Sequence, residues 1–419
     1  MEQQTHTSIF SGIRILDFGM AATVPLAMTW MGDFGATVIK IESHLRPDIS
    51  RAGGPFYQAR MGELEQNGWQ QWLNSSKYSM TLNLSKPEGR ELVLRIIRDW
   101  RPHIIAESFR PGVMKKFGLD YESICRIKPD IIYWSTCLEG QYGPHSRRLG
   151  YGTVSTNLSG ASYLAGWPDR PPAGMPLAYG DFSATGTGLL TLVSALIRWK
   201  KTGKGVHIDQ SQYEVNVHVL AGVIMEYLVN GRVMNRNGNR LPYAAPHGVF
   251  PCRGEDRWVA VSVFTEDEWR RFGDVLGNPE WVKDPKFSTL FLRKRHEDDL
   301  EDHISQWTAG YDAHTVEKMM QENGIAANVV ETGKDIYEDP QLAHYGHFRE
   351  LDHPEIGKIR SEIPPFKFSK SADRHFRAPL LGEHNHYVLS ELLGMSDDEI
   401  SDLYADGVIT TDADLPGQG

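Results

Sequence analysis

Two apolar stretches near the N-terminus decide the fold class: IRILDF at residues 13–18 and ATVIKIE at residues 36–42. Both are rich in branched apolar residues and have the length of strands, and residues 25–33 between them have a helical pattern. A strand, a helix and a second strand within roughly thirty residues have the size of a βαβ unit. The chain therefore begins with a βαβ unit.

Further strands and helices continue this alternation. Strands are predicted at residues 79–84, 103–107 and 131–137. Between the first two, Ser85 can cap a helix and Pro87 suits its first turn. Strands that alternate with helices favour a mostly parallel sheet. The sequence thus predicts a doubly wound α/β domain.

Length and composition are those of an ordinary globular protein. The chain has 419 residues, of which 40% are hydrophobic and 23% charged, enough for two or three domains of about 150 residues each. A net charge of -10 argues against a surface that binds nucleic acid. Cys125, Cys137 and Cys252 are few and widely spaced, which argues against a disulfide framework and fits a reducing cytoplasm. Neither a signal peptide nor a membrane span is predicted.

The composition changes at residues 230–245, where Asn, Gly, Arg and Pro cluster as in a linker. A strand at residues 257–263 and a helix at 266–276 then open a smaller α+β domain. We expect three parts: residues 1–230 form the N-terminal part of a large domain, residues 231–340 the linker and small domain, and residues 341–419 a second linker and the return to the large domain.

The most informative segment is LAYGDFSAT at residues 177–185. A helix is predicted directly after it, at residues 183–201, so Asp181 lies at or just before a helix N-terminus. One interpretation is an N-cap, whose carboxylate accepts backbone N–H bonds. The other is a nucleophile, because a carboxylate that stays ionised can attack a thioester carbonyl. The two interpretations are compatible.

The common nucleotide-binding fingerprints are absent. The turn after the first strand reads GMAAT at residues 19–23, not GxGxxG, and no GxxxxGK[ST] occurs. Residues 185–188, TGTG, lie inside a helical pattern, where close helix packing explains the glycines. A doubly wound sheet without a phosphate loop must bind its ligand in another way.

Six segments, in order along the chain, resemble the class III CoA-transferases of the CaiB/BaiF type. They are the opening βαβ unit at residues 12–42, LNSSK at 73–77, ESFRPG at 107–112, YGD at 179–181, KTGKGVHID at 201–209 and PLLGEH at 379–384. The resemblance implies a Rossmann-like large domain that binds CoA, a small domain joined by two linkers, and an interlocked dimer of ring-like chains.

The resemblance also assigns candidate site residues. Asp181 aligns with the family's nucleophile, which forms a mixed anhydride and then an aspartyl-CoA thioester. The residues expected to bind CoA are Ala22, Thr23, Arg46, Lys77, Leu82, Asn83, Ser108, Phe109, Arg110, Lys116 and Tyr151. Those expected to face the acyl group are Tyr151, Tyr179 and Arg148, with Arg147 as an alternative cation. The expected partners are acyl-CoA, carboxylic acids and an identical or related chain, without a tightly bound cofactor, a metal, nucleic acid or a membrane.

Several positions depart from the family pattern and restrict the substrate. Ala22 and Thr23 replace the glutamine and serine of the formyl-CoA branch, and Ser108 replaces an asparagine. Formate and oxalate are therefore not expected. The chain instead resembles the branch that uses succinyl-CoA to activate benzylsuccinate-like or other substituted dicarboxylates. Apolar residues at 158–172 and 223–228 either pack in the core or line a pocket for an aromatic or branched acid.

Three alternatives remain open. An α-methylacyl-CoA racemase pairs the aspartate with a histidine in a Gly-His-Asp segment. This chain has GYG at residues 150–152, and tyrosine, with a pKa of about 10, is a poor replacement; His145 is the residue that would favour a racemase. A second alternative is a non-catalytic subunit of a heteromeric transferase. A third is a metal enzyme, but the histidines at residues 344–347 and 384–386 lack a nearby carboxylate set and favour surface or packing roles.

Overall fold

The computed structural model describes residues 8–59 and 62–411. The chain divides into two compact units, which are described separately. Unit 1 consists of Met1–Ala161, Met175–Gly231 and His344–Gly419, and unit 2 consists of Ser162–Gly174 and Arg232–Ala343.

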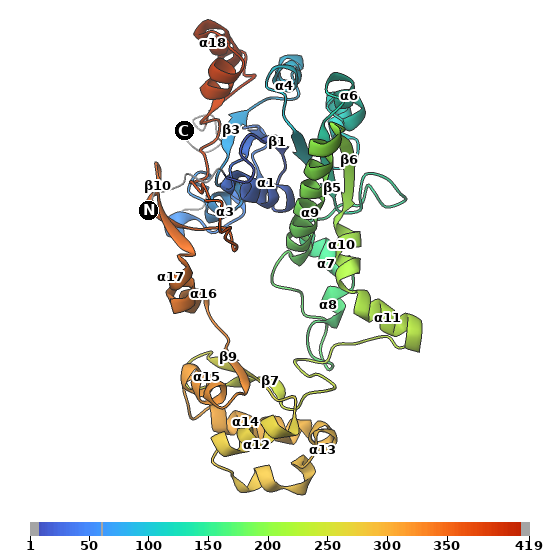
Figure 1. The fold of residues 1–419 in the computed structure, drawn as a ribbon, viewed down its shortest axis with the longest axis vertical. Coiled ribbons are helices and arrows are strands. Elements are labelled where there is room, and N and C mark those ends of the chain that lie inside the picture. Colours follow the sequence, from blue (N-terminus) through green and yellow to red (C-terminus); the bar gives the residue numbers. More distant parts are fainter. Residues whose placement is uncertain (1–7, 60–61, 412–419) are drawn as a thin grey trace. The chain divides into compact units, whose positions relative to one another are not determined.

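Unit 1 contains a six-stranded sheet in which every neighbouring pair is parallel (Figure 1). Its strands are β1 (Arg14–Phe18), β2 (Thr37–Glu42), β3 (Tyr78–Thr81), β4 (Ile104–Glu107), β5 (Ile132–Cys137) and β6 (Val206–Ser211). The strand order is β3-β2-β1-β4-β5-β6. The order reverses between β1 and β4, and in such sheets ligands bind beyond the carboxyl ends of the strands at the reversal. The predicted doubly wound α/β fold is confirmed.

Side chains alternate between the two faces of the sheet, and each face has its own core. Ile15, Ile104 and Trp134 pack against α1 (Thr23–Asp33) and α9 (Tyr179–Thr202). Leu16 and Ile105 point the other way. The helices over that second face are α4 (Pro87–Asp99), α5 (Val113–Phe117), α6 (Tyr121–Ile127), the π-helical turn η4 (Tyr387–Leu392) and α18 (Asp397–Ala405). Apolar positions on both strand faces explain why the strand sequences are continuous apolar runs.

The helix α9 is long and apolar enough to span a membrane by length and composition alone. Its buried face, however, packs Leu192, Ala195 and Leu196 into the core that it shares with α1 and the sheet. Figure 1 shows α9 running beside β5 and β6. We therefore interpret α9 as a core helix of unit 1.

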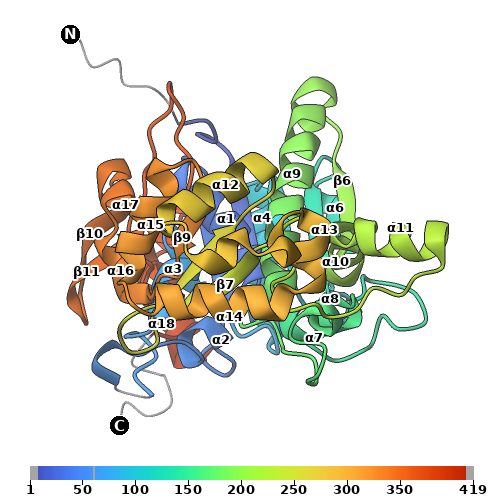
Figure 2. The ribbon, with the colours of Figure 1, turned by 90° about the horizontal axis from the view of Figure 1, so that it is seen from below.

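The remaining elements of unit 1 are short. They are α2 (Ile49–Ala52), η1 (Tyr57–Ala59), α3 (Gly68–Asn74), α7 (Gly152–Leu158), α8 (Ala161–Leu164), α10 (Gln212–Val219), α11 (Ala221–Asn230), α17 (Pro340–Tyr345), and the antiparallel pair β10 (Phe348–His353) and β11 (Gly357–Glu362). Of these, α8 and α17 cross the unit boundaries, and most residues of each belong to unit 2. In Figure 2, α11 projects away from the rest of unit 1, and none of its side chains is buried.

Unit 2 is a small α+β domain. Its antiparallel sheet has the order β7-β8-β9, with β7 (His247–Pro251), β8 (Trp258–Ser262) and β9 (Ala326–Val329). The helical elements are α12 (Glu266–Val275), η2 (Glu280–Lys283), η3 (Pro285–Phe287), α13 (Leu290–Arg295), α14 (Glu297–Thr308), α15 (Ala313–Glu322) and α16 (Gly333–Glu338). The segment Ser162–Gly174 groups with this unit, since the Gly238 N–H donates to Gly166 O at 2.9 Å.

Candidate active site

Asp181 lies in the first turn of α9. This helix begins at Tyr179, earlier than the predicted start at residue 183, because Ala178 O accepts the N–H of Asp181 at 2.8 Å and that of Phe182 at 3.4 Å. Asp181 is therefore a first-turn residue and not the N-cap, a position that Ala178 takes without a side-chain bond. Its carboxylate still lies at the positive end of the helix dipole.

Two groups bind the Asp181 carboxylate. Thr23, the first residue of α1, donates its hydroxyl to Asp181 Oδ1 at 3.0 Å. The backbone N–H of Gly152, the first residue of α7, forms a second hydrogen bond. Because α1 follows β1 directly, these contacts place Asp181 beyond the carboxyl end of the sheet, near the reversal in strand order.

Glycines allow three helices to meet at this point. A Cβ atom on Gly152 would lie 2.1 Å from Asp181 Oδ2. A Cβ atom on Gly180 would lie 2.7 Å from Asn216 Nδ2 on α10 and 2.8 Å from Gly152 O. Larger residues at either position would separate α7, α9 and α10. The glycine of the YGD segment is thus required by packing.

Burial and hydrogen bonding act on Asp181 in opposite directions. Burial raises the pKa of the Asp181 carboxyl, and the bonds from the Thr23 hydroxyl and the Gly152 N–H lower it. Burial removes water that would otherwise solvate the anion. The two donors keep the ionised form accessible. A half-buried carboxylate with two fixed donors is well suited to nucleophilic attack.

The loop after β1 is held by a buried ion pair. Lys40 Nζ lies 2.8 Å from Asp48 Oδ2, with both side chains fully buried, and donates to Gly19 O at 2.7 Å. Asp48 Oδ1 accepts the N–H of Ala21 at 2.8 Å. Ala21 has a φ of 66°, which a residue with a Cβ adopts only when its surroundings impose it. This loop leads into Ala22, the N-cap of α1, and Thr23.

Ser108 ties the end of β4 to the same loop. Its hydroxyl accepts the N–H of Met20 at 2.9 Å and lies 3.2 Å from Met20 O. The structure therefore brings together Ala22, Thr23 and Ser108 near Asp181, all of them predicted site residues. The short serine side chain provides this link where the family pattern has an asparagine.

Three of the predicted CoA-binding residues, Thr23, Lys77 and Leu82, have buried side chains. Lys77 is fully buried and donates to Asp17 Oδ2 at 2.8 Å, Pro25 O at 2.8 Å and Asn74 Oδ1 at 2.9 Å. Burial lowers the pKa of Lys77 to about 8. Leu82 is 1% exposed within the core. The side chains of Lys77 and Leu82 thus stabilise the fold, and a contact of these residues with CoA stays a prediction.

The other candidates for CoA binding differ in exposure. Asn83 is half-buried after β3, at the sheet edge opposite β6, and its N–H donates to Val408 O at 2.8 Å. Arg46, Arg110 and Lys116 are exposed, and Phe109 packs partly against the core. Of these, Arg110 lines a pocket described next.

A pocket of about 230 Å³ lies between the strands β4, β5 and β6 and the helices α5 and α6. Glu107 is buried in it and accepts the N–H of Phe109 at 2.7 Å. Burial raises the pKa of Glu107 to about 7. Ser135 Oγ lies 3.1 Å from His207 Nε2, and Arg110 contributes the guanidinium at the rim.

The residues expected to face the acyl group lie close to Asp181 in sequence. Tyr151, the N-cap of α7, is 66% exposed, and Tyr179, the first residue of α9, is 39% exposed. Arg148 forms an ion pair with Glu139 at 2.5 Å. Arg147 and His145 are exposed on the same loop.

Sequence reasoning missed several residues around Asp181. Gln212 donates to Thr23 Oγ1 at 3.0 Å. The Trp72 ring lies 5.5 Å from the Phe182 ring, beside the nucleophile. Phe182 follows the YGD motif and could have been noticed. Trp72 and Gln212 carry no comparable sequence signal, because only the fold brings them near Asp181.

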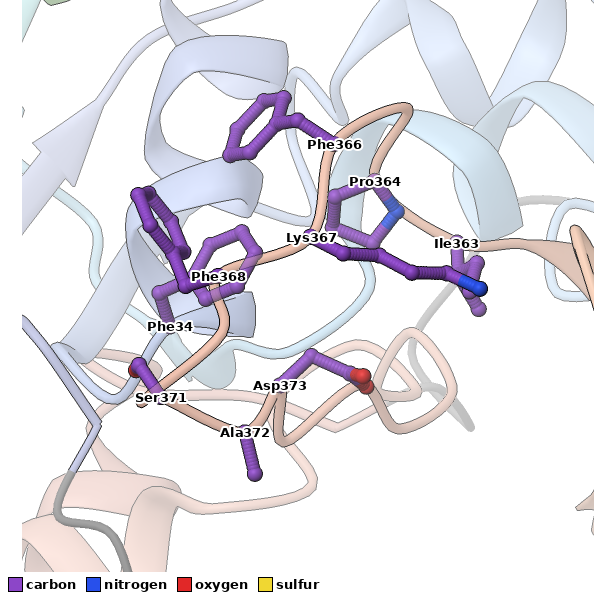
Figure 3. Close-up of a pocket in the computed structure, with 9 residues that line it drawn as sticks. All are labelled: Phe34, Ile363, Pro364, Phe366, Lys367, Phe368, Ser371, Ala372 and Asp373. Atoms are coloured by element: carbon purple, nitrogen blue, oxygen red, sulfur yellow. The ribbon is translucent and has the colours of Figure 1, made fainter. Parts of the chain in front are cut away.

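A second pocket, of about 160 Å³, is lined by aromatic rings (Figure 3). Phe34 stacks on Phe366 at 5.2 Å and meets Phe368 edge-on at 4.9 Å. Phe34 is the C-cap of α1, whereas Thr23 is its first residue, so the length of the helix separates this pocket from Asp181. Because it is remote from Asp181, we do not take this pocket as the candidate active site.

Among residues 8–59 and 62–411, no group of three or more His, Cys, Asp and Glu side chains could hold a metal ion. The geometry instead offers a half-buried carboxylate at a ligand-binding edge of a doubly wound sheet. Such an arrangement can carry out covalent catalysis on an activated acyl group.

Comparison with known proteins agrees with this geometry. The chain is 30% identical to the succinyl-CoA--D-citramalate CoA-transferase of Chloroflexus aurantiacus, over 98% of this chain and 100% of that protein. It is 29% identical to the succinyl-CoA--L-malate CoA-transferase beta subunit of the same organism, over 98% and 100%. A CaiB/BaiF family protein from Brucella suis, 28% identical, superposes with a TM-score of 0.83 over 92% of this chain and 100% of that one.

The model of CoA-transferase family III matches residues 10–385, nearly the whole chain. The match spans all of the segments on which the resemblance was noted. The protein therefore belongs to CoA-transferase family III.

Proposed function

We propose that this CoA-transferase moves CoA from succinyl-CoA to a second dicarboxylic acid, with Asp181 as the nucleophile. The observation that carries the proposal is the half-buried Asp181 carboxylate, held by Thr23 and Gly152 at the ligand-binding edge of the sheet. Relatives whose names specify succinyl-CoA with citramalate or malate support the choice of donor and acceptor class.

The proposed reaction proceeds through three covalent states. Asp181 attacks the thioester carbonyl of succinyl-CoA, giving a mixed anhydride and free CoA thiolate. The thiolate attacks the aspartyl carbonyl, giving an aspartyl-CoA thioester and releasing succinate. The acceptor carboxylate attacks this thioester, giving a second mixed anhydride and the CoA thiolate. The thiolate then attacks the acceptor carbonyl of the anhydride, which forms the product acyl-CoA and frees the Asp181 carboxylate. The thioester energy is conserved throughout, so no ATP is needed.

Each tetrahedral intermediate needs hydrogen-bond donors for its oxyanion. The backbone N–H groups of the first helical turn, at residues 179–183, are the candidates, although those of Gly180 and Asp181 already bind Thr156 Oγ1 and Ala178 O. The Phe182 N–H also binds Ala178 O, and the Ser183 N–H lies beyond the first four donors that a helix start leaves unpaired. The candidate donor is therefore the N–H of Tyr179, the first residue of α9. A single preorganised donor contributes on the order of 3 kcal/mol to such a transition state.

CoA binding is proposed to use the carboxyl ends of β1 and β4. Ala22 and Ser108 belong to the loops that meet there. Phe109, Arg110 and Lys116 follow β4, where a partly exposed ring and two exposed cations suit an adenine and its phosphates. Arg46, exposed after β2, is a further candidate cation, and Asn83 is retained with it.

The acceptor is proposed to be a dicarboxylate with a substituent. Tyr151 and Tyr179 flank the nucleophile and are partly exposed. Arg148 is the candidate cation that would bind the acceptor's second carboxylate. To do so, it would leave its ion pair with Glu139 and pair with the substrate. Trp72 and Phe182 provide aromatic surface beside Asp181, which favours an aromatic or branched substituent.

The geometry disfavours the racemase alternative. Racemisation needs a second acid or base on the opposite face of the α-carbon. Tyr151, the N-cap of α7, stands where the racemase pattern has its histidine, and a phenol is a poor acid or base near neutral pH. This supports a covalent role for Asp181 over proton shuttling.

An assembly with a second chain is proposed, either identical or related. The exposed helix α11 carries Met225, Tyr227, Leu228 and Val229, each more than half exposed. A contiguous apolar surface of this kind marks a protein interface. The relative named as a beta subunit supports the heteromeric option, and the family resemblance supports an interlocked dimer. We also propose that the protein is located in the cytoplasm.

The test is a mass-spectrometric screen of purified protein with succinyl-CoA and a panel of acids. The panel contains unsubstituted, branched and aromatic dicarboxylates, and the matching monocarboxylates. Transfer to dicarboxylates with release of succinate is expected, and Asp181→Ala should abolish it. Transfer only to small monocarboxylates such as formate, or α-proton exchange without transfer, would contradict the proposal.

A further inference from the structure

Three side chains from separate elements form a hydrogen-bond chain that ends on the Asp181 carboxylate. Gln212, the first residue of α10, donates from Nε2 to Thr23 Oγ1 at 3.0 Å. Thr23 Oγ1 lies 3.0 Å from Asp181 Oδ1. Thr23 is 2% exposed and Gln212 is 7% exposed. Solvent is therefore largely excluded from both bonds, which strengthens them.

The chain has a direction. A hydroxyl group has one proton to donate, and an amide nitrogen can only donate. Since Gln212 Nε2 occupies an acceptor position on Thr23 Oγ1, the Thr23 proton is available for Asp181. The other acceptor within reach, Asp181 O, is farther away at 3.4 Å. The Thr23 proton therefore points to the carboxylate.

Each member of the chain is fixed by further bonds. Asn216 Nδ2 donates to Gln212 O at 2.9 Å and to Ser155 Oγ at 2.7 Å, which fixes the start of α10 against α7. Thr185 Oγ1 lies 3.1 Å from Thr23 O and 2.9 Å from Asp181 O, which ties α1 to α9. These bonds fix the helices that carry the hydrogen-bond chain from Gln212 through Thr23 to Asp181, which we call the relay.

We propose that Thr23 and Gln212 are positioning residues that orient the Asp181 carboxylate for attack on the thioester. Thr23 holds Oδ1, and Gly152 packs against Oδ2, so that rotation of the carboxylate is blocked. A displacement of about 1 Å in a reacting group costs roughly a hundredfold in rate. The inference rests on the proposed role of Asp181 as the nucleophile.

The relay should also affect the protonation of the nucleophile. Burial raises the pKa of Asp181, and the Thr23 hydroxyl lowers it. Loss of this donor should raise the pKa further. Because only the ionised carboxylate attacks, the acid limb of the kcat/KM profile should then move to higher pH. A purely structural role for Thr23 would not move this limb.

The first experiment compares Thr23→Val and Thr23→Ser. Valine keeps the shape and removes the hydroxyl, so kcat/KM should fall about ten- to a hundredfold, the effect of one hydrogen bond to a charged group. The acid limb should move to higher pH. Serine restores the hydroxyl and should recover most of the rate and the original limb. Thr202→Val, at the far end of α9, is the matched control and should leave both unchanged.

The second experiment tests the direction of the relay with Gln212→Met and Gln212→Glu. Methionine removes the donor, and the Thr23 hydroxyl can still reach Asp181. Glutamate can only accept when ionised, so it takes the Thr23 proton away from Asp181. The expected order of kcat/KM is wild type, then Gln212→Met, then Gln212→Glu. This comparison stands even if Thr23→Val fails to fold.

Two results would overturn the relay. One is a folded Thr23→Val protein with the wild-type acid limb and a rate within about twofold of wild type, well inside the loss expected for one bond. The other is a Gln212→Glu protein at least as active as Gln212→Met. Asp181→Ala, assayed in parallel, distinguishes failure of the proposed function from failure of the relay. If it remains active, the proposed function fails; if it is inactive while Thr23→Val behaves as wild type, only the relay fails.

Discussion

At the scale of single residues, activity depends on how closely Gly152 approaches the nucleophile. A Cβ atom there would lie 2.1 Å from Asp181 Oδ2, so Gly152→Ala must displace the carboxylate. We expect kcat to fall by at least about a hundredfold, with CoA affinity and the circular dichroism spectrum unchanged. Steady-state kinetics and calorimetry measure these quantities. A folded Gly152→Ala protein with wild-type kcat would contradict the geometry.

Glu107 makes stability depend on pH. Burial raises the pKa of Glu107 from its ordinary value of 4.5 to about 7. Between these values the folded state keeps a proton that the unfolded state has lost. The stabilisation is therefore complete below pH 4.5 and is lost as the pH rises to about 7.

Glu107→Gln should remove this dependence, because glutamine stays neutral and can still accept the Phe109 N–H. We expect the variant to gain on the order of 3 kcal/mol relative to wild type between pH 5 and pH 8. Urea unfolding at both pH values measures the difference. A constant difference across this range would show that Glu107 is ionised throughout.

Only part of the site could be predicted residue by residue. Asp181 was found because the YGD motif precedes a helix, and both signals are local. The burial of Lys77 could not be predicted, because lysine is almost never fully buried and only the fold supplies Asp17 as its partner. The contact of Thr23 with Asp181 joins residues 158 positions apart, so no local pattern contains it.

At the scale of elements, the placement of α9 on the sheet controls the nucleophile. Gly188 lies where a Cβ atom would meet the Trp134 ring at 2.2 Å. Gly186, two residues earlier on the same helix, has nothing within 4 Å. The predicted explanation of these glycines by close packing holds for Gly188 and not for Gly186.

This pair of glycines provides a matched test. Gly188→Ala should destabilise the protein by about 1 to 3 kcal/mol through overpacking and should lower activity, because the helix carries Asp181. Gly186→Ala should be neutral or slightly stabilising, since alanine favours a helix. Denaturant titration and activity assays compare the two variants. Equal stability of the two variants would mean that α9 does not pack on Trp134 as described.

The elements themselves were largely predictable. The strands β1, β2, β4 and β5 are short apolar runs that no helix period fits, and they lie within one or two residues of their predicted positions. The start of α9 was predicted too late because Tyr179 and Gly180 are weak helix formers. Their helical state depends on Thr156, which accepts the Gly180 N–H at 3.1 Å from another helix.

At the scale of the whole molecule, the apolar surface of α11 predicts association. Leu228 is 68% exposed and Val229 is 70% exposed, which is costly for an isolated chain. We expect a dimer in analytical ultracentrifugation and a shift toward monomer in Leu228→Glu. Glu226→Gln on the same helix is the control, since it keeps the apolar surface. A monomer at all concentrations that transfers CoA at full rate would contradict this expectation.

The central claim is that Asp181 becomes covalently attached to CoA during turnover. The direct measurement is intact-protein and peptide mass spectrometry after incubation with succinyl-CoA and rapid quenching. We predict a CoA adduct on the peptide that contains Asp181, lost on addition of an acceptor acid and absent in Asp181→Ala. CoA transfer by a protein that carries no adduct, or an adduct on any other residue, would contradict the account.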